Sequence, residues 1–181
     1  MTEHIKTHGT SLRDDQLIDV YQAYQAEPSP WTAITDQVMG GVSTAEVRQG
    51  ERHGSACTCL SGRTSLENNG GFVQMKLDIQ PSWQCGDYAG FFIELCGPAH
   101  EYNLNVKSTQ LTKPWQSFRC TVNVQPEWAR FVVPYTQLQL QLQPHRTDLE
   151  LDPATIRSIA VIAIGEAFDV DVCVRRFGFY Q

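Results

Sequence analysis

Apolar and polar residues alternate with a period of two along much of this chain after residue 30. The alternation is clearest in the segments 73–79, 91–95, 102–107, 118–124 and 168–175. Because successive side chains of a strand point to opposite faces of a sheet, each segment is expected to be a strand with one buried face. Residues 159–164 are apolar throughout, which predicts a strand that is buried on both faces.

Turn-forming residues separate these segments, among them Gly97-Pro98 and Pro126. Many short strands at even spacing are typical of an all-β sandwich or barrel. Asp152 followed by Pro153 predicts a helix of one or two turns with Asp152 as its N-cap. A bulge at residues 175–176 would let the final alternation continue to the end of the chain.

The ends and edges of the expected domain are less strongly patterned. Residues 1–14 are expected to form a flexible tail, and residues 15–181 a single β-sandwich domain. The first element is either a strand at 17–20 or a helix over 13–26. Residues 137–143 alternate Gln with Leu and are expected to form an edge strand or a loop over the sandwich.

Composition excludes several function classes. The net charge is −6, and no basic cluster is present, which argues against a nucleic-acid partner. No apolar run is long enough to span a membrane, and the N-terminus resembles no secretory signal, so a cytoplasmic protein is expected. The six cysteines are expected to be reduced and mostly buried. Cys57 and Cys59 would share one strand face, but no second pair has ligand spacing, so no metal is expected.

No catalytic constellation is visible in the sequence. Gly41-Val42-Ser43 lacks the second glycine of a nucleophile elbow, and neither a phosphate loop nor a dinucleotide fingerprint occurs. The chain is therefore expected not to be an enzyme and to need no cofactor. A hydrolase with two facing carboxylates remains an alternative, because a sequence cannot show such a pair.

Residues 31–43, read as WTAITDQVMGGVS, form the stretch richest in residues that are hard to exchange. Gly40 and Gly41 indicate a backbone with positive φ or a close approach by another segment. One interpretation is a tight connection between strands that Asp36 fixes through hydrogen bonds. The other is a binding loop at the rim of the sandwich, with Met39 as an adaptable contact. The two are compatible.

A second such stretch is Asn68-Asn69-Gly70-Gly71. Asn and Gly tolerate left-handed backbone, so the segment is expected to be a β-hairpin loop between 64–67 and 72–74.

The two stretches together resemble the signature of the complex I intermediate-associated protein 30 family. The first block runs from Trp31 through Asp36 and VMGG to Ser43, and the second is LSG at 60–62 with LENNGGF at 66–72. Looser matches continue to about residue 180. The resemblance implies a jelly-roll β-sandwich of the galactose-binding-like type. In mitochondrial members it implies a factor for assembly of NADH:ubiquinone oxidoreductase. Pro98 stands where the family has an acid, and the N-terminus lacks a mitochondrial targeting pattern, so a bacterial protein is expected.

The expected function is therefore a non-enzymatic, assembly-factor-like protein that contacts a partner protein, such as a respiratory-complex subunit. The expected binding residues lie in the two stretches: Trp31, Asp36, Met39, Gly40, Gly41, Ser43, Asn68, Asn69 and Gly71. The alternative is a carbohydrate-binding module with a small sugar ligand, which would need exposed aromatic side chains. Trp83 and Trp115 occupy turn-like surroundings and are the candidates.

Overall fold

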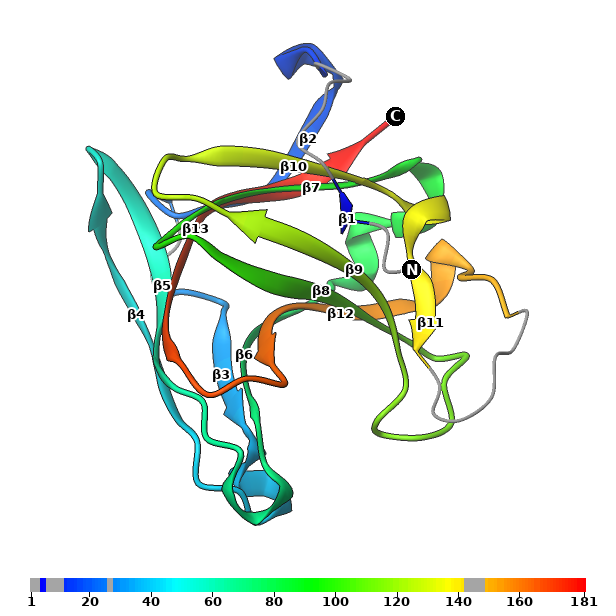
Figure 1. Cartoon of the computed structure of the whole chain (residues 1–181). Helices are drawn as coiled ribbons and strands as arrows, with labels where there is room; N and C mark the ends of the chain where they lie inside the picture. Colours follow the sequence, from blue (N-terminus) through cyan, green and yellow to red (C-terminus); the bar gives the residue numbers. More distant parts are fainter. Residues whose placement is uncertain (1–3, 6–11, 26–27, 142–148) are drawn as a thin grey trace.

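Two β-sheets face each other across a single apolar core in the computed structural model (Figure 1). The structure describes residues 4–5, 12–25, 28–141 and 149–181. In this part of the chain, all strand pairs are antiparallel except one short parallel pair near the N-terminus. The predicted all-β sandwich is confirmed.

The strands are short to medium in length, and the helices are single 3₁₀ turns. The strands are β1 (His4–Ile5), β2 (Leu17–Gln22), β3 (Thr32–Thr35), β4 (Thr44–Arg52), β5 (Ser55–Arg63), β6 (Phe72–Asp78), β7 (Gly90–Cys96), β8 (His100–Ser108), β9 (Ser117–Val124), β10 (Ala129–Pro134), β11 (Gln139–Gln141), β12 (Ile156–Ile164) and β13 (Asp169–Tyr180). The 3₁₀ turns are η1 (Asp14–Gln16), η2 (Asp36–Met39), η3 (Glu67–Asn69), η4 (Pro81–Trp83), η5 (Cys85–Asp87), η6 (Tyr135–Gln137) and η7 (Pro153–Thr155). None of the helices in the described ranges is long and apolar enough to cross a membrane.

The seven-stranded sheet has the order β1-β9-β8-β12-β6-β3, and β11 pairs with the edge of β9. The six-stranded sheet has the order β10-β7-β13-β5-β4. Its sixth strand, β2, pairs with the second half of β13, whereas β5 pairs with the first half. The long strand β13 therefore links three neighbours and organises this sheet.

The period-two alternation correctly predicts which side chains enter the core. Val73, Met75 and Leu77 of β6 are buried, as are Val172 and Val174 of β13. Each buried aliphatic side chain of this size contributes about 1.5–3 kcal/mol of hydrophobic stabilisation. The inward faces of the two sheets thus supply the main stabilising term.

The predicted bulge in β13 is confirmed. The register of β13 against β7 shifts between Val174 and Arg176. The extra residue reverses the alternation, so that Phe177 and Phe179 lie on the core face together with Val174.

The alternative of a strand is confirmed and that of a helix over 13–26 is wrong, because residues 17–22 pair with β13 as β2 and only the short turn η1 precedes them. β1 pairs with β9. Residues 1–3 and 6–11 of the expected tail lie outside the described residues, so the boundary between tail and domain stays a prediction.

Two other local predictions are confirmed. The side chain of Asp152 accepts a hydrogen bond from the amide of Ala154 at 3.1 Å and caps the single turn η7. The Gln-rich segment supplies the edge strand β11. Gln137 ends the turn η6, and residues 142–143 lie outside the described residues.

The prediction of a β-hairpin at residues 68–71 is wrong. The strand before this loop, β5, belongs to the six-stranded sheet, and the strand after it, β6, belongs to the seven-stranded sheet. Asn68 and Asn69 do adopt positive φ angles of 55° and 57°. The turn residues thus indicate the local backbone, but they do not say which strands pair.

The prediction of reduced cysteines is wrong for one pair. Cys59 and Cys173 form a disulfide, and their Cα atoms lie 4.0 Å apart. The two residues are opposite each other in the register of β5 and β13 although 114 positions separate them in sequence. The free thiols of the described chain are buried, as expected: Cys57, Cys85, Cys96 and Cys120.

Candidate functional site

The two stretches singled out from the sequence meet at one end of the sandwich. The first loop connects β3 to β4, and the second connects β5 to β6, so both cross from one sheet to the other. Figure 1 shows them side by side at the lower end of the molecule, η2 in blue and η3 in green-blue. Two crossings at one place make this end a joint between the sheets.

The carboxylate of Asp36 holds this joint together. Asp36 is fully buried, and it accepts hydrogen bonds from the amide of Ser43 at 3.0 Å and the hydroxyl of Ser43 at 2.5 Å. It also accepts from the amides of Gly71 at 2.6 Å and Phe72 at 3.3 Å. One side chain thus binds donors from both loops, and Gly71 lies 35 residues from Asp36 in sequence.

These contacts change the acidity of Asp36. Burial alone would raise the pKa of its carboxyl, but the hydrogen bonds from Ser43, Gly71 and Phe72 outweigh that effect. The pKa of Asp36 therefore lies below the usual 3.8. A carboxylate whose acceptor positions are occupied by structural donors is a poor general base, so Asp36 acts as a structural anion.

The glycines around Asp36 leave room for its carboxylate. A Cβ at Gly41 would lie 2.3 Å from Cγ of Asp36, and a Cβ at Gly70 would lie 2.5 Å from its Oδ2. Gly40 and Gly71 instead have positive φ angles of 87° and 130°. The Gly pairs of both stretches are therefore required by packing and backbone conformation.

Five of the expected binding residues lie inside the protein: Trp31, Asp36, Gly41, Ser43 and Gly71. The indole of Trp31 is 3% exposed and meets Tyr21 and Phe177 edge to face, so its role is core packing. Ser43 and Gly71 are buried. This burial excludes a direct contact between Trp31 and a partner.

The exposed part of the joint is apolar. Val38 is 74% exposed and Met39 66%, and Val42 and Leu66 are exposed as well. We call these four side chains the apolar tip. The amide of Asn68 donates to the carbonyl of Gly40 at 3.3 Å and ties the two loops at the surface. Of these four, the sequence predicts only Met39 as a binding residue. Val38, Val42 and Leu66 were missed because single apolar residues in loops carry no periodicity.

A groove lies on the outer face of the seven-stranded sheet. It has a volume of about 1220 Å³ and lies over β3, β6, β8 and β12. Polar side chains that point away from the core line its floor, including Gln74, Lys76, Asn105, Lys107 and Ser158. Sequence patterns mark these positions only as outward-facing, and cannot show that they enclose a groove.

Asn105 occupies an unusual place in this groove. Its side chain is 5% exposed, and its Oδ1 has no hydrogen-bond partner among the residues that the structure describes. Lys107, two residues further along β8, donates hydrogen bonds to the carbonyls of Pro114 and Gln116. It thereby holds the loop that joins β8 to β9. Trp115 stands on that loop with 62% of its surface exposed, whereas Trp83 is half-buried against the core.

A family profile described as Complex I intermediate-associated protein 30 (CIA30) matches residues 20–172. The chain belongs to the CIA30 family. The match includes both loops of the Asp36 joint and nearly all of the sandwich. Comparison with curated protein sequences finds no significant match.

Solved structures similar to this CIA30 chain include carbohydrate-binding modules. The family 11 module of cellulosomal cellulase Lic26A-Cel5E of Clostridium thermocellum has a TM-score of 0.71 and 12% identity, over 91% of this chain and 95% of that one. The family 11 module from Clostridium thermocellum in complex with a β-1,3-1,4-mixed-linked tetrasaccharide has a TM-score of 0.70 and 13% identity. The likeness covers 92% of this chain and 95% of that one. A family 30 module has a TM-score of 0.56 and 12% identity, over 84% of this chain and 92% of that one. At these identities the likeness concerns the fold, and the jelly-roll sandwich is confirmed.

Replacing Asp36 by Asn tests the joint. Asn keeps the size but turns an NH₂ group toward N–H donors, so the variant should lose about 2–3 kcal/mol of unfolding free energy. The melting temperature should fall by roughly 5–10 °C in thermal denaturation followed by circular dichroism. Asp169→Asn is the control, because Asp169 forms an exposed pair with Arg63. Equal melting temperatures for the two variants would contradict the role of Asp36.

The lowered pKa of Asp36 predicts how this stability depends on pH. A depressed carboxyl pKa adds stability above the pKa of the unfolded chain, about 3.9, and this stability is lost as the pH falls through the folded-state pKa. The difference between wild type and Asp36→Asn should therefore be constant near neutral pH and shrink below about pH 4. Urea denaturation over this range measures it. A difference that persists unchanged in acid would show that folding does not lower the pKa of Asp36.

Proposed function

We propose that this chain is a non-catalytic binding protein, in which the Asp36 joint presents the apolar tip to a partner protein. The single observation that carries this proposal is the contrast between the two parts of the joint. Asp36 and its donors are buried and fixed, while Val38 and Met39 are largely exposed. A rigid scaffold that presents exposed apolar side chains on loops is typical of a binding site.

The chemistry of the tip suits an adaptable apolar contact. Met39 is unbranched and polarisable, and it can adjust to irregular partner surfaces. Val38, Val42 and Leu66 add branched apolar groups around it. Subunits that have not yet been assembled expose the apolar surfaces of their future interfaces. The tip would bind such a surface until assembly covers it.

Membership of the CIA30 family suggests which assembly is concerned. We infer that the partner is an unassembled subunit or intermediate of NADH:ubiquinone oxidoreductase, or of a related protein complex. The buried carboxylates agree with a binding role. Asp36 is saturated by loop donors, and Glu94 is paired with Arg130 and Arg175 at 2.9 and 2.7 Å.

Loss of the tip should abolish partner capture. A double variant, Val38→Ser with Met39→Ser, should recover at least about tenfold less NADH:ubiquinone oxidoreductase subunit than wild type, since buried anchors dominate interfaces. The measurement is affinity purification from the native host with quantitative mass spectrometry. Ile18→Ser is the matched control, because Ile18 is an exposed aliphatic residue on β2. Recovery of those subunits by the double variant at the wild-type level would contradict the proposal.

The groove supports a second candidate function, the binding of a neutral saccharide. The observation in its favour is the unpartnered Oδ1 of the nearly buried Asn105, which could accept a hydrogen bond from a sugar hydroxyl. Trp115 lies next to the groove-lining Pro114 and offers an exposed aromatic face. The solved modules of the same fold make this candidate reasonable to test.

A glucan-binding test separates the two candidates. Isothermal titration with mixed-linked β-glucan oligosaccharides should show binding that Asn105→Ala weakens at least about tenfold, because a desolvated acceptor is lost. Asn123→Ala is the control, as Asn123 is exposed on β9 outside the groove. The tip variant should bind glucan normally. No heat of binding for any oligosaccharide tried would remove this candidate.

A further inference from the structure

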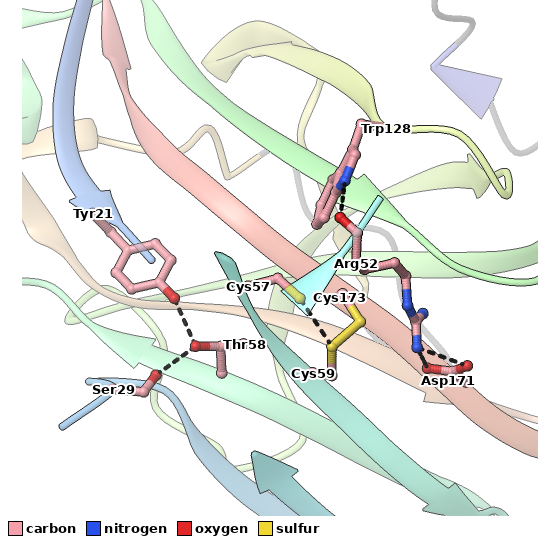
Figure 2. The surroundings of a disulfide bond; sticks show 9 residues. All are labelled: Tyr21, Ser29, Arg52, Cys57, Thr58, Cys59, Trp128, Asp171 and Cys173. Atoms are coloured by element: carbon pink, nitrogen blue, oxygen red, sulfur yellow. Dashed lines mark hydrogen bonds and ion pairs between the residues drawn. A yellow bond between two sulfur atoms is a disulfide. The ribbon is translucent and has the colours of Figure 1, made fainter. Parts of the chain in front are cut away.

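Four cysteines gather on the outer face of the six-stranded sheet. Cys57 and Cys59 lie on β5, Cys173 lies opposite Cys59 on β13, and Cys96 lies opposite Cys173 on β7. With Trp128 they form a cluster of their own, separate from the main core. Figure 2 shows Cys57, Cys59 and Cys173 converging beside Trp128 and Arg52.

Three of these sulfurs are close enough to share one ion. Sγ of Cys57 lies 3.5 Å from Sγ of Cys59, and the Sγ atoms of Cys57, Cys59 and Cys173 all lie within 4.8 Å of one another. Three thiolates around an ion at about 2.3 Å would be spaced by about 4 Å. A structural disulfide needs only two cysteines, so the bond between Cys59 and Cys173 does not account for the third sulfur.

We propose that, when reduced, Cys57, Cys59 and Cys173 form a three-thiolate site for a cuprous ion. Soft thiolate ligands select Cu⁺ or Zn²⁺, and Zn²⁺ in structural sites takes four ligands in a tetrahedron. The nearest carboxylate along β13, Asp171, is held by Arg52 in an ion pair of 2.9 Å and does not join the group of three. Cys96, the fourth cysteine of the cluster, is also not among the sulfurs that lie within 4.8 Å of one another. Three sulfur ligands therefore favour Cu⁺.

Two cations lie beside such a site, and each of them is also paired with a carboxylate. Three thiolates and one Cu⁺ carry a net charge of −2, which is costly to bury unless cations lie nearby. Arg52, on β4, points to the same cluster in Figure 2, and its guanidinium is paired with Asp171 at 2.9 Å. A second cation, Arg175, stacks over the ring of Trp128 at 4.7 Å, and Trp128 in turn donates to the carbonyl of Arg52 at 3.0 Å.

The Cys59–Cys173 bond controls whether the site can form. A dithiol reductant transfers two electrons and two protons to this bond, becomes a disulfide itself, and leaves two thiols on the protein. Together with Cys57 these give three thiols, which release their protons as Cu⁺ binds. Cys59 is the only one of the three that is not fully buried, so a reductant would attack there.

The test compares oxidised and reduced protein. Full-length chain is reduced with a dithiol, freed of it under anaerobic conditions, and titrated with Cu⁺ supplied as its bicinchoninate complex. Reduced wild type should withdraw one equivalent of Cu⁺, and oxidised wild type should compete at least about tenfold less well. This comparison needs no substitution and so does not depend on the folding of a variant.

Two variants identify the ligands. Reduced Cys57→Ser should bind Cu⁺ at least about tenfold more weakly than reduced wild type, because a thiolate is lost. Cys85→Ala should bind as wild type does, since Cys85 lies on η5 near Tyr135. Equal binding by oxidised and reduced protein, or by Cys57→Ser and wild type, would overturn the site. Uptake of Zn²⁺ but not Cu⁺ would overturn the choice of ion.

Discussion

The arrangement of this molecule depends on one buried carboxylate that binds two loops at once. Two sheets packed only through apolar faces could slide, because hydrophobic contact has no preferred direction. The hydrogen bonds of Asp36 are directional, and they join the crossing from β3 to β4 with the crossing from β5 to β6. They fix where both crossings lie, and with them the relation of the sheets at this end.

The same interaction explains why the sequence marks this place so clearly. Gly41 and Gly70 lie too close to Asp36 to carry a side chain, and Gly40 needs a left-handed backbone. The glycines and Ser43 of the family signature are thus what the carboxylate requires, and they identify the fold better than the contact surface. The exposed Val42 and Leu66 are free of those requirements, so no local pattern distinguishes them.

The fold was predictable as far as it depends on the alternation of side chains. The core faces of β6 and β13, the bulge before Phe177 and the cap at Asp152 all follow from local signals. Pairing between distant strands does not follow from local signals. The loop at 68–71 has hairpin residues but joins different sheets, and Cys173 meets Cys59 only through the register of β13. The groove likewise arises from the placement of four strands that are not consecutive in sequence.

The two outer faces of the sandwich differ in a way that limits where ligands can bind. On the six-stranded sheet, both faces of β7 are buried, because Arg130 and Arg176 cover Phe92 and the buried Glu94 draws Arg130 and Arg175 inward. The outer face of β7 is therefore covered by neighbouring side chains. On the seven-stranded sheet, the outward side chains leave a broad groove whose acceptor on Asn105 is unpartnered within the described chain. An extended ligand therefore has more room in this groove than beside β7, and in the function that we propose a protein partner binds the apolar tip at the end of the sandwich.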